Sequence, residues 1–309
     1  MKQDMVKIQK EVTENIVKAL EKGVATWIRP WDACSDGVMV PSNHSTLKPY
    51  RGINVLNLNW IAMSEGWPNT WGTFNMWKKE SDKLNKKMLK KNPKHKNKWF
   101  GVKKQMSGSK VFYWNMIKVK DEKHVNGEKF IPILKVFTVF NVAQTDMPKP
   151  KKKRDRRKLL DIEKDIKNMI KEHKIDFQEG GNSAFFNFRK DFVKIPDRKQ
   201  FKTLEDRAST ILHEFTHWTG HPSRLNRDMK GGFGSEDYAK EELVAELGSA
   251  ILCQTLGLSI EGLQHSEYIG SWIKKLKEPS GYKYLFQASG KAQKAVDYLL
   301  GTQFDKEDN

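Results

Sequence analysis

The sequence contains only two cysteines, Cys34 and Cys253, and they lie far apart along its 309 residues. So few cysteines exclude a disulfide framework and a CxxC site, and they fit a reducing cytosol. No apolar run approaches the roughly 18 residues needed to cross a bilayer. The N-terminus also lacks the apolar region of a signal peptide; it has the spacing of an amphipathic helix, with Val6, Val12 and Ile16 on a related face. We therefore expect a cytoplasmic protein without a membrane partner.

Acidic residues are scarce relative to basic ones, because 38 Asp and Glu stand against 56 Lys and Arg, which gives a net charge of +18. This balance does not select a fold. It favours polyanionic partners, nucleic acid before an anionic membrane surface. Hydrophobic residues make up 38% of the chain, enough to build a folded core. At roughly 100 to 200 residues per domain, the length predicts two domains.

A basic segment, PKPKKKRDRRK at 148–158, separates two halves of different character. Its like charges repel and its prolines prevent a continuous helix, so we predict an exposed linker. A direct contribution of this segment to nucleic-acid binding is the alternative. The predicted domains are therefore residues 1–147 and 159–309.

The fold class predicted for the chain is α+β. Segments 110–120 and 130–140 have the β-branched and aromatic composition of strands. In the second half, 159–174 has helical spacing, 183–188 and 191–196 form a short strand pair, and the chain after Thr203 is mostly helical. We expect a mixed first domain and a mainly helical second domain with a small sheet.

The stretch HEFTH places His213, Glu214 and His217 in the pattern H-E-x-x-H. Thr203 and Asp206 form a T-x-x-D capping pair upstream, so a helix is predicted to begin there. On a helix, the four-residue spacing puts both imidazoles on one side, one turn apart, where they can share one metal ion. The alternative is two partly exposed helical histidines near a structural glutamate.

A third metal ligand must come from another segment. The stretch SEDYAKEELVAELGSAILC predicts a helix capped by Ser235, with Glu242 and Glu246 beside its apolar face. Carboxylates in that position are costly unless they bind something. We predict Glu242 as the third ligand and Glu246 as an acceptor for the N–H of a ligating imidazole. Glu241 is the alternative to Glu242 as the third ligand. His221 is a less favoured ligand, and if it does not bind the metal we expect it to lie next to the residues that do.

Two His and one Glu leave an open position for water on a zinc ion, or on manganese or another divalent metal. The metal would lower the pKa of that water, and Glu214 would take its proton before attack on an amide carbonyl. The oxyanion helper is unassigned, with His221 and Tyr238 as candidates. The edge of the strand pair at 183–196 could hold an extended peptide by backbone pairing.

Eight of the ten tryptophans lie in the first 114 residues, where Lys alternates with Trp, Phe and Tyr. A single strand offers phosphates to Lys and base faces to aromatic rings, whereas duplex DNA offers no free base faces. We therefore predict single-stranded DNA as a partner; the alternative is that these aromatics belong to the core. The residues predicted to contact it are Arg51, Trp77, Lys78, Lys98 and Trp99.

Several further blocks occur in order along the chain, namely PYRGINVLNLNW (49–60), WGTF (71–74), FTVFNVAQTD (137–146), LHEFTHWTGHPSRLNRD (212–228), FGSEDYAKEELVAELGSAILC (233–253) and YIGSWIKKLK (268–277). With these blocks the chain resembles the ArdC-type antirestriction proteins of plasmids and phages. The resemblance implies an N-terminal domain that binds single-stranded DNA and a C-terminal zincin-like (gluzincin-type) metallopeptidase domain. It places the metal ligands on His213, His217 and Glu242 and the catalytic role on Glu214.

The resemblance also implies that the protein protects incoming DNA in a bacterial host cell, with a host restriction or defence component as the possible protein substrate. Family likeness alone does not establish an activity. The alternative is a non-catalytic protein that coats single-stranded DNA and carries a structural or vestigial metal site.

Overall fold

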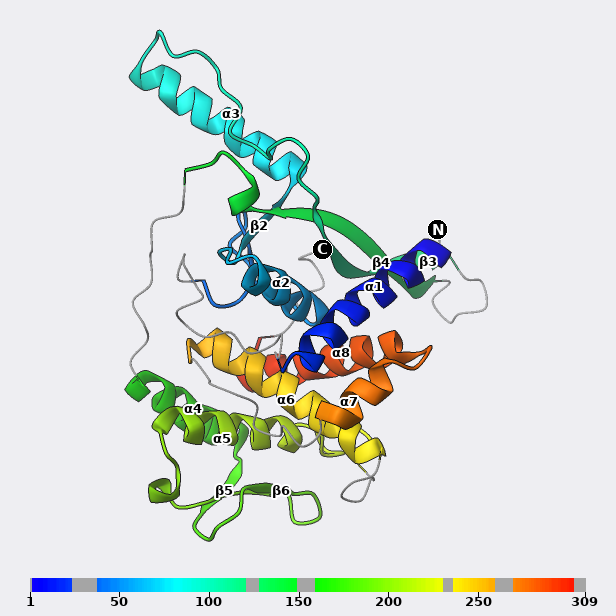
Figure 1. Cartoon of the computed structure of the whole chain (residues 1–309). Helices are drawn as coiled ribbons and strands as arrows, with labels where there is room; N and C mark the ends of the chain where they lie inside the picture. Colours follow the sequence, from blue (N-terminus) through cyan, green and yellow to red (C-terminus); the bar gives the residue numbers. More distant parts are fainter. Residues whose placement is uncertain are drawn as a thin grey trace.

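The computed structural model describes residues 2–23, 38–120, 128–148, 159–229, 236–258 and 269–302, and Figure 1 shows how they are arranged. Two features that the sequence predicts fall outside the described residues. They are residues 149–158 of the basic linker and the cap at Ser235. None of the helices in the described part is long and apolar enough to cross a membrane.

The first half combines helices with a four-stranded sheet. The strand order is β1-β2-β4-β3, in which β1 runs parallel to β2 and the other neighbours are antiparallel. The elements are α1 (Lys2–Glu21), β1 (Ser42–Asn43), α2 (Ile53–Ser64), β2 (Thr70–Thr73), α3 (Phe74–Lys91), β3 (Ser109–Lys120), β4 (Glu128–Asn141) and a short 3-10 helix, η2 (Val142–Gln144).

The sequence predicted the long hairpin β3–β4 well, because both strands are rich in β-branched and aromatic residues. The predicted helix at the N-terminus is also present, with Val12 and Ile16 buried on its inner face. Gly23 follows it at φ +72°, a left-handed conformation that glycine adopts at little cost and that ends the helix. The very short β1 and β2 were not predicted, since so few residues carry no periodic signal.

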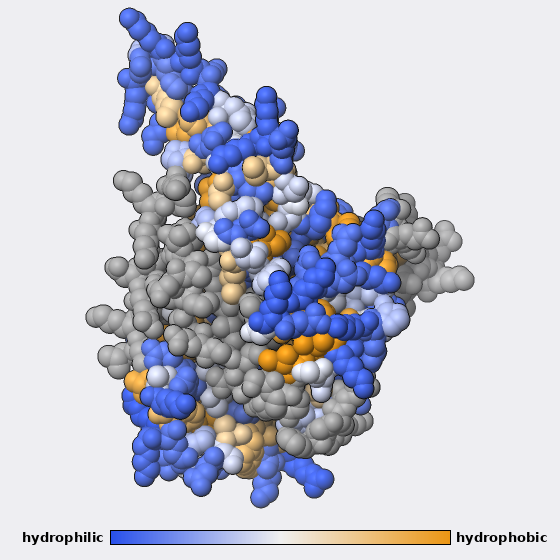
Figure 2. Space-filling model, in the orientation of Figure 1, coloured by the Kyte–Doolittle hydropathy of each residue, from blue (hydrophilic) through white to orange (hydrophobic). Residues whose placement is uncertain are grey.

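Helix α3 projects from the body of the molecule, as Figure 1 shows. The Thr73 hydroxyl caps it by accepting a hydrogen bond from the Met76 amide at 3.3 Å. Its buried residues are Trp77, Ser81 and Asn85, which are spaced four apart and so form one narrow inner face. The other faces carry lysines, and this projecting part is hydrophilic in Figure 2.

The second half is mainly helical, with a three-stranded sheet in the order β5-β7-β6. β5 runs parallel to β7, and β6 is antiparallel to it. The elements are α4 (Leu159–His173), β5 (Asp176–Glu179), β6 (Phe185–Asn187), β7 (Phe192–Ile195), η3 (Arg198–Gln200), α5 (Leu204–Trp218), α6 (Glu236–Leu256), α7 (Ile269–Leu276) and α8 (Gly281–Leu300). The predicted strand pair is therefore confirmed, whereas β5 was not predicted.

The two halves share one hydrophobic core. Ile16 of α1 and Leu56 of α2 belong to the same buried cluster as Leu212 of α5, Leu247 of α6 and Leu285 of α8. Helix α6 contacts both α5 and α8, and its residues 241–250 are all buried. The predicted α+β class is confirmed, and the central position of α6 explains how several of its glutamates come to lie in the interior.

Candidate metal centre

Helix α5 places the two histidines of the H-E-x-x-H pattern on one side. Thr203 caps the helix, as predicted, through a 3.0 Å hydrogen bond from the Asp206 amide to its hydroxyl. The ring centroids of His213 and His217 are 4.8 Å apart, and both residues are buried. The spacing along one helix therefore brings the imidazoles together without any help from the rest of the fold.

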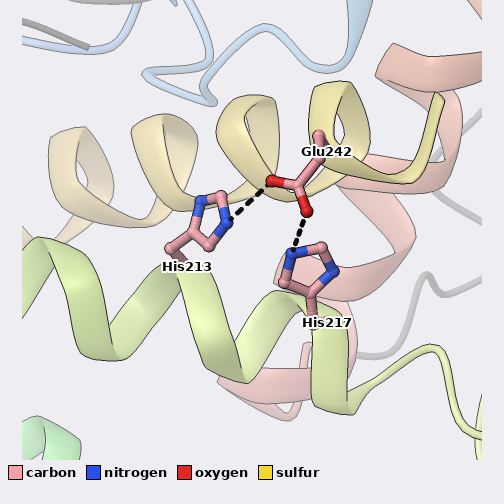
Figure 3. A group of neighbouring side chains, drawn as sticks. All are labelled: His213, His217 and Glu242. Carbon is pink, nitrogen blue, oxygen red and sulfur yellow. Dashed lines mark ion pairs between the residues drawn. The ribbon is translucent and has the colours of Figure 1, made fainter. Parts of the chain in front are cut away.

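Helix α6 supplies the carboxylate between them. In Figure 3, Glu242 lies opposite both rings, with one oxygen toward each. Its Oε2 atom is 3.5 Å from Nε2 of His213, and its Oε1 atom is 3.4 Å from Nε2 of His217. One ligand atom from each of the three residues lies within 4.8 Å of the others. Two imidazoles and one carboxylate form a donor set suited to zinc or another first-row divalent ion.

The second nitrogen of each imidazole faces a further glutamate of α6. Nδ1 of His213 is 3.8 Å from Oε2 of Glu246, and Nδ1 of His217 is 3.3 Å from Oε1 of Glu241. A carboxylate in this position fixes the tautomer and orientation of a ligating imidazole. Glu246 thus lies beside His213, and its role as an acceptor for a ligating imidazole stays a prediction. Glu241 serves the other histidine, a role that the sequence did not assign to it.

Arg227 completes this arrangement, and no feature of the sequence singled it out. Its Nη2 atom lies 2.6 Å from Oε1 of Glu241, and its Nε atom donates to Oε2 at 3.0 Å. The same guanidinium donates to the Thr219 hydroxyl at 2.8 Å and to the Thr216 carbonyl at 2.6 Å. Because Arg227 and Glu241 are both buried, the pair holds the carboxylate beside His217 in one position.

The electrostatics of the group depend on these contacts. Burial alone would lower the pKa of His217, but hydrogen bonds and charges from Glu241 and Glu242 outweigh it and raise that pKa to about 10. Burial would raise the pKa of Glu242, yet its contacts with His213 and His217 hold it well below its usual range. The raised pKa favours the protonated, positively charged form of His217 beside these carboxylates.

A cavity of about 220 Å³ opens beside the three residues. Glu214, which is 5% exposed, lines it together with the candidate ligands and Tyr238. Phe186 and Phe188 of the β6 region form an apolar wall on another side. A carboxylate, a phenol and an apolar surface thus line one cavity beside the candidate metal position.

His221 does not join this group through any contact that the structure describes. Its Nδ1 atom lies 2.7 Å from the Ser223 hydroxyl and 3.8 Å from Asp191, and its ring packs against Phe188. Phe188 also lines the cavity beside the candidate ligands, so the position of His221 beside the metal ligands stays a prediction. The helix ends at Trp218, so His221 lies just beyond the helix that carries His213 and His217.

The prediction that Trp77 contacts DNA is also wrong. The residue is fully buried, and its indole N–H donates to the Phe140 carbonyl at 3.0 Å. It packs with Val102 and Val142 in a small core that fixes the base of α3. A tryptophan in this position cannot stack on a base.

The other predicted DNA contacts differ in their surroundings. Lys78, Lys98 and Trp99 are exposed, on or next to the projecting α3. The Trp99 indole N–H donates to the Val102 carbonyl at 2.9 Å, and the side chain is 42% exposed. Arg51 forms an ion pair with Asp297 of α8, so its charge is partly committed to the contact between the two halves.

Comparison with known proteins defines the class of each half. Residues 164–291 match the family model of the zincin-like metallopeptidases, and residues 6–140 match that of the N-terminal domain of anti-restriction factor ArdC. The chain thus carries a zincin-like domain that follows an ArdC N-terminal domain. The chain belongs to the ArdC family of antirestriction proteins, as its similarity to whole members of that family shows.

The metal-free crystal structure of antirestriction protein ArdC from plasmid R388 is 31% identical, covers 94% of this chain and 96% of that chain, and has a TM-score of 0.71. Its Mn(II)-bound structure gives the same TM-score at 29% identity. The uncharacterized protein y4eC of Sinorhizobium fredii is 31% identical over 98% of this chain and 94% of its own length. DNA primase TraC of Escherichia coli is 31% identical over 94% of this chain, which spans only 27% of that longer protein.

Proposed function

We propose that this protein is a metal-dependent peptidase joined to a half that binds single-stranded DNA, and that it protects incoming DNA from a restricting bacterial host. The observation that carries the proposal is the convergence of His213, His217 and Glu242 beside Glu214 in one cavity. We assign the first three residues to the metal. The ion is zinc or manganese, and the Mn(II)-bound relative supports the second choice.

A divalent ion held there supplies Lewis-acid chemistry, because it polarises an amide carbonyl and lowers the pKa of a water. Glu214 lines the same cavity, and we assign it as the base that accepts the proton from the attacking water. It then returns the proton to the leaving amine. Glu241 and Glu246 keep the two imidazoles oriented during this cycle. Tyr238 is the candidate donor to the carbonyl oxygen.

The substrate is an extended peptide, for which the β6 region provides a site. β6 pairs with β7 on one side only among the described strands, and it lies at the edge of the sheet. Phe186 and Phe188 line the cavity next to this edge. Backbone pairing with β6 would hold a peptide across the metal position while the phenylalanines take apolar side chains. A host restriction or defence protein is the substrate class that suits an antirestriction role.

The nucleic-acid partner is single-stranded DNA, bound by the first half. Lys78, Lys98 and Trp99 are exposed around the projecting α3, where cations and an aromatic face meet. Binding through such cations releases counterions, so affinity should fall steeply as salt rises. The ArdC N-terminal family match supports this assignment. The DNA would bring the peptidase half to proteins that act on the entering strand.

The deciding experiment compares wild type with Glu214→Gln in a transfer assay of unmodified DNA into a restricting host. Glutamine keeps the shape of the side chain but cannot accept the proton, so the variant should retain its metal and lose protection. Metal content of the purified variant is the control. Full protection by Glu214→Gln would instead favour a protein that shields DNA without cleaving anything, for which the exposed basic α3 is the supporting observation.

A further inference from the structure

A second cavity, of about 620 Å³, lies between the two halves and shares no lining residue with the candidate metal centre. Its volume falls within the roughly 300 to 1,000 Å³ typical of sites for small ligands. The walls come from the first turn of α2, from β3 and from α8. Neither the H-E-x-x-H chemistry nor the projecting α3 accounts for a cavity in this place.

Aromatic side chains form the floor and one wall of this interdomain cavity. The rings of Phe112 and Phe286 meet edge to face with centroids 4.8 Å apart, and Phe112 is 4% exposed. Residues two apart on a strand share a face, so Trp114 lies next to Phe112 on the cavity side of β3. Trp114 is 59% exposed, which leaves its large ring open at the mouth of the cavity. Exposed tryptophan beside an apolar cavity is typical of a site that receives a flat ring.

Positive charge surrounds the same opening. Lys48 and Lys294 line the cavity from opposite halves of the chain, and both are exposed. Asp297 is the acidic residue among the lining residues, and its carboxylate is ion-paired with Arg51. The first turn of α2, residues 52–54, also lines the wall, so the positive end of that helix dipole adds to the potential. An apolar floor with a cationic rim suits a ligand that is flat and apolar in one part and anionic in another.

We propose that this cavity receives one unstacked base of a bound single strand, with the base on Trp114 and the flanking phosphates at Lys48 and Lys294. The inference rests on the proposed binding of single-stranded DNA and adds a specific site to it. Bases in a duplex are paired and stacked and cannot enter, so the cavity discriminates against duplex DNA. α8, which forms one wall, also packs against the helix that carries Glu242, so the strand is anchored directly against the peptidase half.

The test uses the full chain and a labelled oligothymidylate in an anisotropy titration at low salt. Trp114→Ala should bind about tenfold more weakly than wild type, because a base loses its stacking partner. Trp114→Phe keeps an aromatic face and should restore most of the affinity. Phe185→Ala removes another exposed ring, 40% exposed and in the second half, and should bind like wild type. Because Trp114 is exposed, its replacement should leave the melting temperature unchanged.

A second measurement locates the base directly. An oligothymidylate containing 4-thiothymidine, irradiated on the protein, should cross-link to the tryptic peptide that contains Trp114. If wild type binds the strand, but Trp114→Ala binds equally well or the cross-links fall only on α3, the cavity is not the base site and the proposed DNA binding stands. If wild type does not bind the strand at all, both the proposed DNA function and the cavity assignment are wrong.

Discussion

Nδ1 of His217 lies 3.3 Å from Oε1 of Glu241, while the opposite nitrogen of the same ring faces Glu242. The imidazole is thus held between an orienting carboxylate and a candidate ligand. Arg227 in turn fixes Glu241 from behind through hydrogen bonds that are fully buried. These contacts connect Arg227, which follows α5, to the candidate metal position. Replacing Glu241 or Arg227 should therefore affect metal binding, as replacing a ligand would.

Metal content should depend on His217 and not on His221. Replacing His217 with alanine removes one of three ligands, so the purified variant should lose most of its bound zinc or manganese. His221→Ala is a matched control from the same segment, because His221 contacts Ser223 and Asp191 instead. Elemental analysis of both variants checks the assignment. Equal metal content in His217→Ala and wild type would contradict it.

Glu241→Gln should weaken metal binding by roughly 10- to 100-fold, because an orienting carboxylate raises the basicity of a ligating imidazole. Competition with a chelator of known affinity measures the effect. An exposed glutamate of α4, changed in Glu172→Gln, is the control and should leave the affinity unchanged. An unaltered affinity in Glu241→Gln would mean that the contact with His217 serves folding alone.

Metal binding at neutral pH should release about one proton, since the pKa of His217 is raised to about 10 in the metal-free protein. Affinity should therefore increase with pH until that pKa is passed. Titration calorimetry in buffers with different ionisation enthalpies counts the released protons. The stability of the metal-free protein should change with pH in the opposite direction to the metal affinity. The proton on His217 stabilises the metal-free fold fully below pH 6.5, and this contribution is lost as pH rises toward 10. Binding heats that do not depend on the buffer would contradict the raised pKa.

Trp77→Ala should reduce the free energy of unfolding by about 3 kcal/mol or more, because it removes a fully buried ring and leaves a cavity. Trp99→Ala removes an exposed ring of the same region and should cost far less. Urea denaturation followed by circular dichroism compares the two. If Trp77→Ala unfolds at the same urea concentration as wild type, its small core does not support α3 as the structure indicates.

The sequence predicted those helices and strands whose signal lies within the element itself, such as a cap, a helical spacing or a strand composition. The four-residue spacing of His213 and His217 fixed their common side, and Thr203 marked where α5 begins. The β-branched and aromatic composition of segments 110–120 and 130–140 identified β3 and β4. β5 was missed because four residues after a helix carry no clear period, and its partner β7 lies sixteen residues further along the chain.

The sequence alone determined the chemistry available to the protein: two imidazoles one helical turn apart, a glutamate beside them and a strongly basic chain. It also indicated that Glu242 and Glu246 share one side of a helix, because their spacing follows the helical repeat, while their roles at a metal stay predictions. Only the tertiary structure decided that Glu241 and Arg227 stand behind His217, that Trp77 lies in a core and that Trp114 opens into a cavity between the halves. These outcomes depend on which faces pack together, and packing is set by contacts between segments that no local period encodes.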